Sequence, residues 1–291
     1  MSVVVDHPDG ATAIGWENRA GTKMVLNETQ ISELASRLIK AEDTCQQIGL
    51  PSELHPDMGM DDAYAVQKAI LGHKLARGRK VLGWKIGLTS RAMQQALNID
   101  IPDSGVLFDD MAFENDCIVP AGRFIQPRVE AEIAFVMKSP LTGDNITRQD
   151  VIEATDYVAP SLEILDTRVL RVSADTGNSR TVLDTISDNA ANAGIVLGDK
   201  THDVSAFDLR WVGAIVSRDG EVEETGLGAG VLNDPVAGIV WLTRRMSQYG
   251  QDIRAGDVIL SGSFIRPLET THGTVIEADY GDFGTVKCTF E

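Results

Sequence analysis

The sequence predicts an α+β protein in which N-terminal helices pack on a mostly antiparallel, β-rich body. Apolar residues recur at helical spacing before residue 100, whereas later segments alternate apolar and polar residues between turn signals. Helices and strands do not alternate regularly, as they would in a parallel βαβ fold. We therefore expect one functional domain, made of an N-terminal extension (1–25), a helical region (26–100) and a β-rich catalytic body (101–291).

The helical region is predicted to contain two main helices. The first begins after Asn27, a good N-cap residue, and its core-facing residues are Ile31, Leu34, Ala35 and Leu38. After the loop PSELHPDMGM, a second helix begins near Asp61, with an apolar stripe formed by Tyr64, Ala65, Ala69 and Leu71–Leu75. The segment VLGWKIGLTS (81–90) then predicts a short buried strand, and Ser90 is a suitable N-cap for a helix through Ala96.

The β-rich body is predicted from strand runs and their turns. RFIQPRVEAEIAFVMK is one long strand, and LRWVGAIVSRDGEVEETG is a hairpin with its turn at Asp219-Gly220. Asp234-Pro235 begins a helix that ends at Gly250, and DVILSGSFIRP is a strand. HGTVIEADY and TVKCTF form a final hairpin around a GDFG turn.

Composition narrows the function classes. The formal net charge is −17, so a surface of this sign repels nucleic acid and anionic membranes, and neither is an expected partner. An anionic small-molecule substrate would need a local positive site, either a metal ion or a few arginine and lysine side chains. Three widely spaced cysteines predict no disulfide framework, and the N-terminus has no signal-peptide pattern, so we expect a cytoplasmic protein.

Two glutamates in FIQPRVEAEIAF raise the question of a metal site. Glu130 and Glu132 are two positions apart, so their side chains share one face of the predicted strand. One interpretation is a solvent-facing side with the apolar neighbours turned inward. The other is a divalent cation between the two carboxylates, and oxygen ligands alone suit Mg²⁺, Mn²⁺ or Ca²⁺. The five histidines lack zinc-site spacing.

Three further residues are candidates, each with an ordinary alternative. Glu163 lies in an apolar setting and is either a third metal ligand or an ion-pair partner of Arg168. Lys85, in GWKIG, is either a surface lysine or a partly buried one that pairs with a carboxylate or an anionic substrate. Asp103 follows Pro102 and is either an Asx-turn residue or a functional group.

A polar stretch and a glycine-rich segment are less informative. DTISDNAANAG (184–194) concentrates side chains that need partners, which predicts a buried polar network or a loop fixed by side-chain bonds. TGLGAG (225–230) does not follow the strand-to-helix pattern of a dinucleotide-binding fingerprint.

Taken together and in order, these motifs resemble the hydratase/decarboxylase branch of the fumarylacetoacetate hydrolase superfamily. The resemblance rests on GWKIGLTSRAMQ, IDIPDSGVLFDDM, PRVEAEIAFV, ATDYVAPSLEILDTR, DTISDNAANAGIVLG and LSGSFIRP, and it covers roughly residues 30–291. It implies the β-rich superfamily fold, a homo-oligomer, and Mg²⁺ or Mn²⁺ held by Glu130, Glu132 and Glu163.

The resemblance also implies a reaction. The substrate class would be a 2-hydroxy-dienoate or its 2-oxo tautomer, hydrated to a 4-hydroxy-2-oxo acid. A bound metal would act as a Lewis acid toward the 2-oxo acid. Lys85 would pair with the 2-oxygen or assist proton transfer, and Asp103 would be the general acid and base.

The distal end of the substrate distinguishes the branch members. A dicarboxylic substrate needs a basic residue at its far end, and Arg266 in SGSFIRP is the predicted contact, with Ser263 also assigned to substrate binding. Arg168 and Arg128 are less favoured because each has a glutamate nearby in sequence. Alternatives that stay open are hydration of a five-carbon dienoate, decarboxylation of a related 2-oxo acid, C–C hydrolysis, and a non-catalytic assembly subunit.

Overall fold

The computed structural model describes residues 24–91, residue 94 and residues 101–291. The predicted extension over residues 1–25 and the predicted helix from Ser90 through Ala96 therefore fall mainly outside the described residues. Among these residues, no helix combines the length and the apolar character that crossing a membrane requires.

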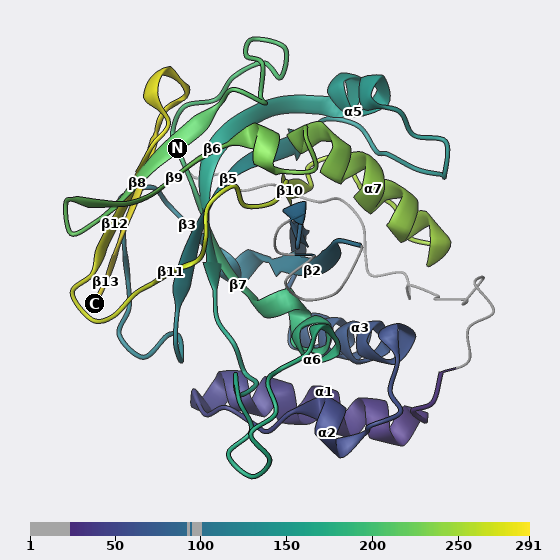
Figure 1. The fold of residues 1–291 in the computed structure, drawn as a ribbon. Helices are drawn as coiled ribbons and strands as arrows, with labels where there is room; N and C mark the ends of the chain where they lie inside the picture. The colour runs from purple at the N-terminus through teal and green to yellow at the C-terminus, as the bar shows by residue number, and fades with distance from the viewer. Residues whose placement is uncertain (1–23, 92–93, 95–100) are drawn as a thin grey trace.

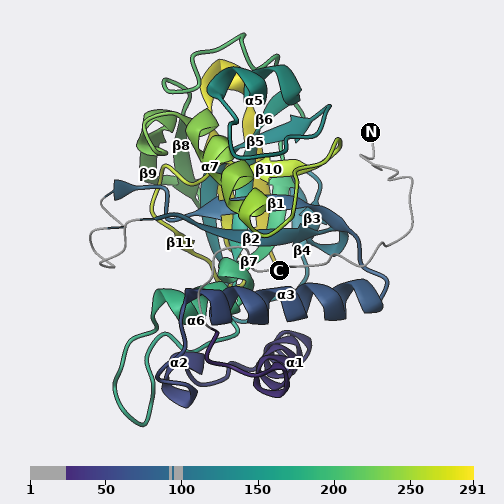
Figure 2. The same cartoon turned by 90° about the vertical axis from the view of Figure 1, so that its right-hand side faces the viewer.

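The helices form two groups (Figures 1 and 2). They are α1 (Glu28–Thr44), α2 (Pro51–Leu54), α3 (Met60–Ala76), α5 (Arg148–Ala154), α6 (Val182–Ser187) and α7 (Pro235–Gln248). In both views, α1, α2, α3 and α6 form a layer at one end of the β body, whereas α5 and α7 lie together at the other end. The prediction of N-terminal helices packed on a β-rich body is confirmed.

The strands of the described residues form two sheets. The larger has the order β2-β1-β10-β5-β6-β7-β3, with β11 also paired to β5, and the smaller has the order β4-β13-β12-β8-β9. The larger sheet consists of β1 (Val81–Gly87), β2 (Asp103–Phe108), β3 (Ala112–Phe113), β5 (Arg128–Met137), β6 (Thr155–Leu165), β7 (Asn192–Leu197), β10 (Val258–Leu260) and β11 (Leu268–Glu269). The smaller consists of β4 (Cys117–Val119), β8 (Gly213–Arg218), β9 (Glu221–Leu227), β12 (Val275–Asp279) and β13 (Thr285–Phe290).

Most strand pairs are antiparallel, as expected. The parallel pairs are β1 with β10, β3 with β7 and β4 with β13. The predicted hairpins at Asp219-Gly220 and around GDFG are both present, as β8–β9 and β12–β13. One apolar core, built from side chains of both sheets, α5 and α7, joins the two sheets into a single body.

Local sequence signals explain several helix boundaries. The Asn27 side chain accepts the Gln30 N–H at 3.0 Å, and the Gln30 side chain accepts the Asn27 N–H, which completes a capping box for α1. Asp234 caps α7, whose first residue is Pro235, as predicted. The prediction of an irregular PSELHPDMGM loop was wrong at its start, because Pro51 occupies the first position of the short helix α2.

Two strands are shorter than their sequence patterns suggested. β5 begins at Arg128 instead of residue 123, directly after Pro127, which has no N–H to donate to the ladder. β10 covers only Val258–Leu260 of the predicted DVILSGSFIRP strand. The ladder stops because Gly262 has φ +118° and donates its N–H to the Glu132 side chain.

Candidate metal and catalytic site

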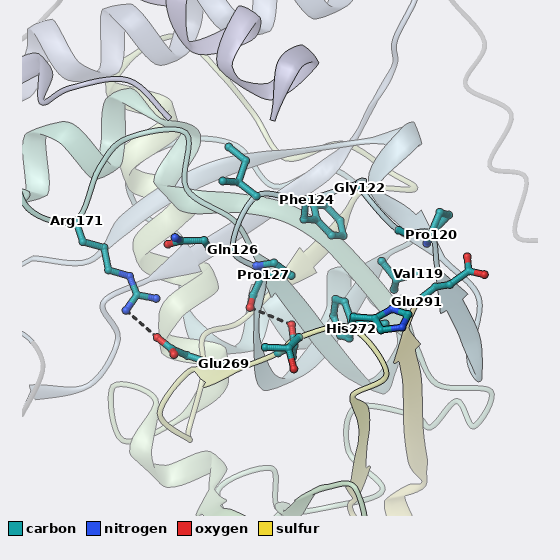
Figure 3. A pocket seen from close by; sticks show the side chains of 15 residues that line it. Val119, Pro120, Gly122, Phe124, Gln126, Pro127, Arg171, Glu269, His272 and Glu291 are labelled. Atoms are coloured by element: carbon teal, nitrogen blue, oxygen red, sulfur yellow. Dashed lines mark hydrogen bonds and ion pairs between the residues drawn. The ribbon is translucent and has the colours of Figure 1, made fainter. Parts of the chain in front are cut away.

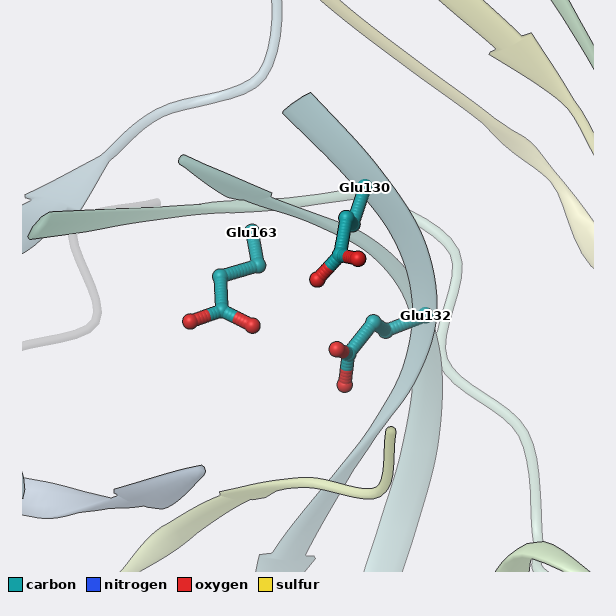
Figure 4. Close-up of side chains that lie close together, drawn as sticks. All are labelled: Glu130, Glu132 and Glu163. Atoms are coloured by element: carbon teal, nitrogen blue, oxygen red, sulfur yellow. The ribbon is translucent and has the colours of Figure 1, made fainter. Parts of the chain in front are cut away.

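Three glutamate side chains converge between two neighbouring strands (Figure 4). Glu130 and Glu132 project from the same face of β5, and Glu163 projects from β6 directly opposite Glu130 in the ladder. One carboxylate oxygen from each residue lies within 4.8 Å of the other two. The opposite face of β5 holds Val129, Ala131 and Ile133, which are all fully buried. The solvent-facing interpretation of the glutamate pair was therefore wrong.

The cluster, here called the glutamate triad, has buried oxygens that form no hydrogen bond within the described part of the protein. Glu132 and Glu163 expose 1% and 0% of their surface. Among the described residues, Glu132 Oε1 and both Glu163 oxygens are buried without a hydrogen-bond partner. Buried carboxylates in this state are costly, and a hard divalent cation is the partner whose ligand preference they fit. The triad residues therefore suit Mg²⁺, Mn²⁺ or Ca²⁺.

Burial raises the pKa of all three triad carboxyl groups, and repulsion between them adds to the rise for Glu130 and Glu132. Burial and then the negative charge of Glu163 raise the pKa of Glu130 to about 8. Burial, followed by the charges of Glu163 and Glu130, places the pKa of Glu132 well above its ordinary value. Burial also raises the pKa of Glu163, although the positive charge of Lys85 opposes this. A bound cation would favour the charged form of all three.

Lys85 is buried beside the triad. It is 4% exposed, and its Nζ lies 3.4 Å from Glu163 Oε1. Burial lowers the pKa of Lys85, but the negative charges of Glu163 and Asp103 outweigh it, so the pKa lies above its ordinary value. The interpretation of Lys85 as a surface lysine was wrong.

The alternative pairing of Glu163 with Arg168 was also wrong. The Arg168 Nε lies 2.5 Å from Asp188 Oδ1, and the Arg168 Nη2 donates to the Asp188 carbonyl at 2.6 Å. Arg168 thus belongs to a buried polar network around Asp188, Asn189 and Asn192, which confirms the prediction made from DTISDNAANAG.

Asp103 stands next to Lys85 and is not a turn residue. It is the first residue of β2, opposite Gly87 in β1, and it is 2% exposed. A Cβ at Gly87 would lie 2.2 Å from Asp103 Oδ1 and 3.0 Å from Lys85 Nζ, so only glycine allows both groups to approach here. Burial raises the pKa of Asp103, against the opposing charge of Lys85, which favours a carboxyl group that can hold a proton.

Two residues that support Glu132 were not predicted. The Gly262 N–H donates to Glu132 Oε2 at 2.7 Å. The Tyr280 hydroxyl lies 3.0 Å from the Glu132 carbonyl and 2.6 Å from the Ser161 carbonyl, so it joins β5 to β6 beside the triad. Both contacts span more than 100 residues of sequence, and no local pattern marks them.

Ser263 and Arg266 lie in the segment after β10. The Ser263 hydroxyl donates to the Ile265 carbonyl at 2.9 Å and accepts the Ile265 N–H, which fixes a local turn next to Gly262. The Arg266 side chain is 81% exposed, and its Nε lies 2.8 Å from Glu224 Oε1. Ser263 therefore directly follows Gly262, whose N–H contacts Glu132, whereas Arg266 is paired with a carboxylate of β9.

A surface groove among the described residues lies apart from the triad. It has a volume of about 720 Å³ and extends along β4, β11 and the C-terminal end of β13. Figure 3 shows the ion pair between Arg171 and Glu269 at one side of it and His272 and Glu291 at the other. We place the chemistry at the triad because buried carboxylate oxygens that form no hydrogen bond to any described residue meet a charged lysine there.

Known proteins similar to this chain include several enzymes. No family model matches the chain. It is 46% identical over 257 residues to 2-oxo-hept-4-ene-1,7-dioate hydratase of Escherichia coli, covering 88% of this chain and 96% of that protein. It is 41% identical to 2-keto-4-pentenoate hydratase of Paraburkholderia xenovorans, covering 91% and 97%.

Solved structures show the same fold. The 4-oxalocrotonate decarboxylase of Pseudomonas putida G7, complexed with magnesium and adipate, superposes with a TM-score of 0.87 at 32% identity. The match covers 92% of this chain and 100% of that one. Fumarylpyruvate hydrolase of Pseudomonas aeruginosa, in complex with Mn²⁺ and pyruvate, gives a TM-score of 0.53 at 13% identity and shares the fold alone.

Proposed function

This chain belongs to the hydratase/decarboxylase branch of the fumarylacetoacetate hydrolase superfamily, and we propose that it hydrates 2-oxo-hept-4-ene-1,7-dioate to a 4-hydroxy-2-oxo dioate. It is a hydro-lyase, in line with the hydratases it resembles over nearly its whole length. The observation that supports the site assignment most strongly is the glutamate triad, with its buried unpartnered oxygens beside Lys85 and Asp103.

The triad would hold the divalent cation, which we propose to be Mg²⁺ or Mn²⁺. When bound, that ion supplies Lewis-acid polarisation of the 2-oxo carboxylate end of the substrate. The Gly262 N–H orients Glu132, and Lys85 lies against Glu163. Two of the three metal-binding glutamates therefore have fixed positions before the metal ion binds. Preorganisation of this kind lowers the reorganisation that binding requires.

Lys85 and Asp103 provide the charge and the proton transfer. The Lys85 ammonium stays positive and is placed to stabilise negative charge that develops on the substrate 2-oxygen. Asp103 takes a proton from C3 and returns it at C5, which moves the double bond into conjugation with the 2-oxo group. It then accepts a proton from water as the water oxygen adds to C4, and it passes that proton to C3. The atoms of the substrate and one water molecule therefore equal those of the product.

Substrate contacts and assembly complete the proposal. Ser263 contacts the substrate from the segment after β10. Arg266, the residue predicted from sequence for the distal carboxylate, would have to exchange Glu224 for that carboxylate.

The protein forms a homo-oligomer and works on small dicarboxylates, and light scattering on the purified chain measures the assembly.

Purified enzyme assayed with a panel of dienols tests the function. We expect loss of dienol absorbance with the seven-carbon dioate, abolition of that loss by EDTA, and recovery with Mg²⁺. Full activity in EDTA would contradict metal-dependent hydration.

Decarboxylation is the second candidate, favoured by the match to 4-oxalocrotonate decarboxylase. It conserves the metal-binding step but releases CO₂ in place of adding water. Stoichiometric CO₂ from any substrate in the panel would identify a decarboxylase, whereas its absence, together with a hydroxylated product, identifies a hydratase. An isolated chain that is metal-loaded and turns nothing over would indicate an assembly subunit.

A further inference from the structure

Three arginines lie near the first residue of β5, the strand that carries Glu130 and Glu132. Arg128 is two residues before Glu130, and it is opposite Glu269 in the β5–β11 ladder. Arg171 Nη1 lies 2.8 Å from Glu269 Oε1, and the Arg180 N–H donates to the Arg171 carbonyl at 2.8 Å. We call Arg128, Arg171 and Arg180 the arginine cluster.

Two of these three arginines form no ion pair of their own with the residues that the structure describes. Within the described part of the chain, the side chains of Arg128 and Arg180 form no ion pair or hydrogen bond, although both are partly buried. Glu269 pairs with Arg171 alone. Carboxylates lie near both side chains, Glu130 and Glu269 in the case of Arg128, but among the described residues none of them bonds to either guanidinium.

Arg168 is a useful comparison, because its guanidinium is bound by groups of the protein itself. It is buried, and its guanidinium binds Asp188 and the carbonyls of Asp166, Asp188 and Asn192. Arg128 has no such set of partners among the described residues. Two half-buried guanidinium groups that repel each other are unfavourable unless an anion joins them, and the planar guanidinium matches a carboxylate through two hydrogen bonds.

The spacing from the triad matches a dicarboxylate. Two strand residues advance by about 7 Å, which separates the backbone of Arg128 from that of Glu130. The terminal carbons of a seven-carbon dioate are six bonds apart and reach about 7 Å when extended. Both side chains share the same face of β5. A substrate that places its 2-oxo acid end at the triad can therefore extend its other carboxylate toward Arg128.

We propose that Arg128 and Arg180 form the subsite that binds the distal carboxylate of the dicarboxylic substrate, with Arg171 at its solvent side. The subsite rests on the proposed function, because it presupposes a 2-oxo acid end at the triad. It accounts for a feature of β5 that the alternation alone leaves open: Arg128 shares the face of Glu130 without forming an ion pair with it. It also selects dicarboxylates over monocarboxylates of the same branch.

Steady-state kinetics of Arg128→Ala and Arg180→Ala test the subsite on two substrates, the seven-carbon dioate and a five-carbon monocarboxylic dienoate. We expect kcat/KM for the dioate to fall roughly 10- to 100-fold in each variant, mainly through KM, because each loses a charged hydrogen bond. The value for the monocarboxylate should change less than about threefold. Arg218→Ala, which removes an exposed arginine paired with Glu223 on the smaller sheet, is the matched control and should alter neither.

Binding without turnover gives a second measurement that survives a loss of activity. Calorimetry with the Mg²⁺-loaded protein compares adipate with hexanoate, which differ only in the distal carboxylate. Wild-type protein should bind adipate more tightly, and Arg128→Ala and Arg180→Ala should remove that difference. Circular dichroism of each variant verifies the fold, and Arg128→Lys should restore part of the adipate preference if Arg128→Ala does not fold.

The outcomes separate the subsite from the function. Equal kcat/KM of the wild-type enzyme for the five-carbon monocarboxylate and the seven-carbon dioate would overturn the proposed substrate. Wild-type preference for the dioate that persists in both arginine variants would overturn the subsite and leave the function intact. Loss of that preference in Arg266→Ala alone would also overturn it, and would place the distal carboxylate at the segment after β10.

Discussion

Replacement of Lys85 by methionine tests whether a buried charge pair holds the site together. The Lys85 Nζ lies 3.4 Å from Glu163 Oε1, and the two side chains are 5% and 0% exposed. At that distance an effective dielectric of about 20 gives an attraction of about 5 kcal/mol. Methionine retains most of the side-chain volume, so the change removes mainly the charge and leaves Glu163 buried without a cation.

We expect Lys85→Met to lower the free energy of unfolding by about 3–5 kcal/mol in EDTA at pH 8, as is usual when one partner of a buried pair is lost. The loss should be smaller at pH 6, because Glu163 can then take up a proton and avoid the uncompensated charge. Urea unfolding followed by circular dichroism measures both values.

Lys287→Met is the matched control, because Lys287 is 38% exposed and pairs with Asp116 at 3.3 Å. An exposed pair of this kind contributes at most about 1 kcal/mol. The double variant Lys85→Met with Glu163→Gln should regain much of the stability, because the unpaired charge is gone. A Lys85→Met protein no less stable than Lys287→Met at pH 8 would refute the reasoning.

Three further predictions concern glycines and protonation. Gly87→Ala should reduce kcat by about tenfold or more, because its Cβ would lie 2.2 Å from Asp103 Oδ1; unchanged kcat would remove the packing argument. Gly72→Ala, at an exposed position inside α3 where a Cβ meets nothing within 4 Å, should raise the free energy of unfolding by about 0.5–1 kcal/mol in urea titrations. Glu130 has a folded-state pKa of about 8 against an ordinary 4.5, so its stabilising contribution is complete below the ordinary value and is lost as the pH rises through 8. The Tm of EDTA-treated protein should therefore fall as the pH rises from about 5 to about 8 and level off above that, by calorimetry. Saturating Mg²⁺ should remove most of that fall; equal slopes with and without Mg²⁺ would contradict it.

Local patterns predicted the parts of the fold that depend on neighbours in sequence. The Asn27 cap, the Asp234-Pro235 helix start and the Asp219-Gly220 hairpin all follow from side-chain chemistry within a few residues. Strand alternation likewise placed Glu130 and Glu132 on one face. The limits of β5 and β10 were missed because a proline and a glycine with positive φ end their ladders.

The partners of the site residues could not be read from local patterns. The sequence offered Glu163 either a metal ion or Arg168 as its partner, and only the pairing of distant strands shows that Lys85 lies beside it. Gly262 reaches Glu132 across 130 residues. Arg266 was predicted from its motif, but motif position does not show that Glu224 lies beside it. Contacts between distant segments depend on register, which a single sequence leaves undetermined.

Titration of metal-free protein with Mn²⁺, followed by electron paramagnetic resonance, tests the central claim most directly, that Glu130, Glu132 and Glu163 hold one divalent ion. Wild-type protein should bind one ion per chain, and Glu163→Gln should bind it roughly 100-fold more weakly or not at all. Glu277→Gln, which changes an exposed glutamate on β12, should bind as wild type does. Binding of one ion to Glu163→Gln with wild-type affinity would contradict the account.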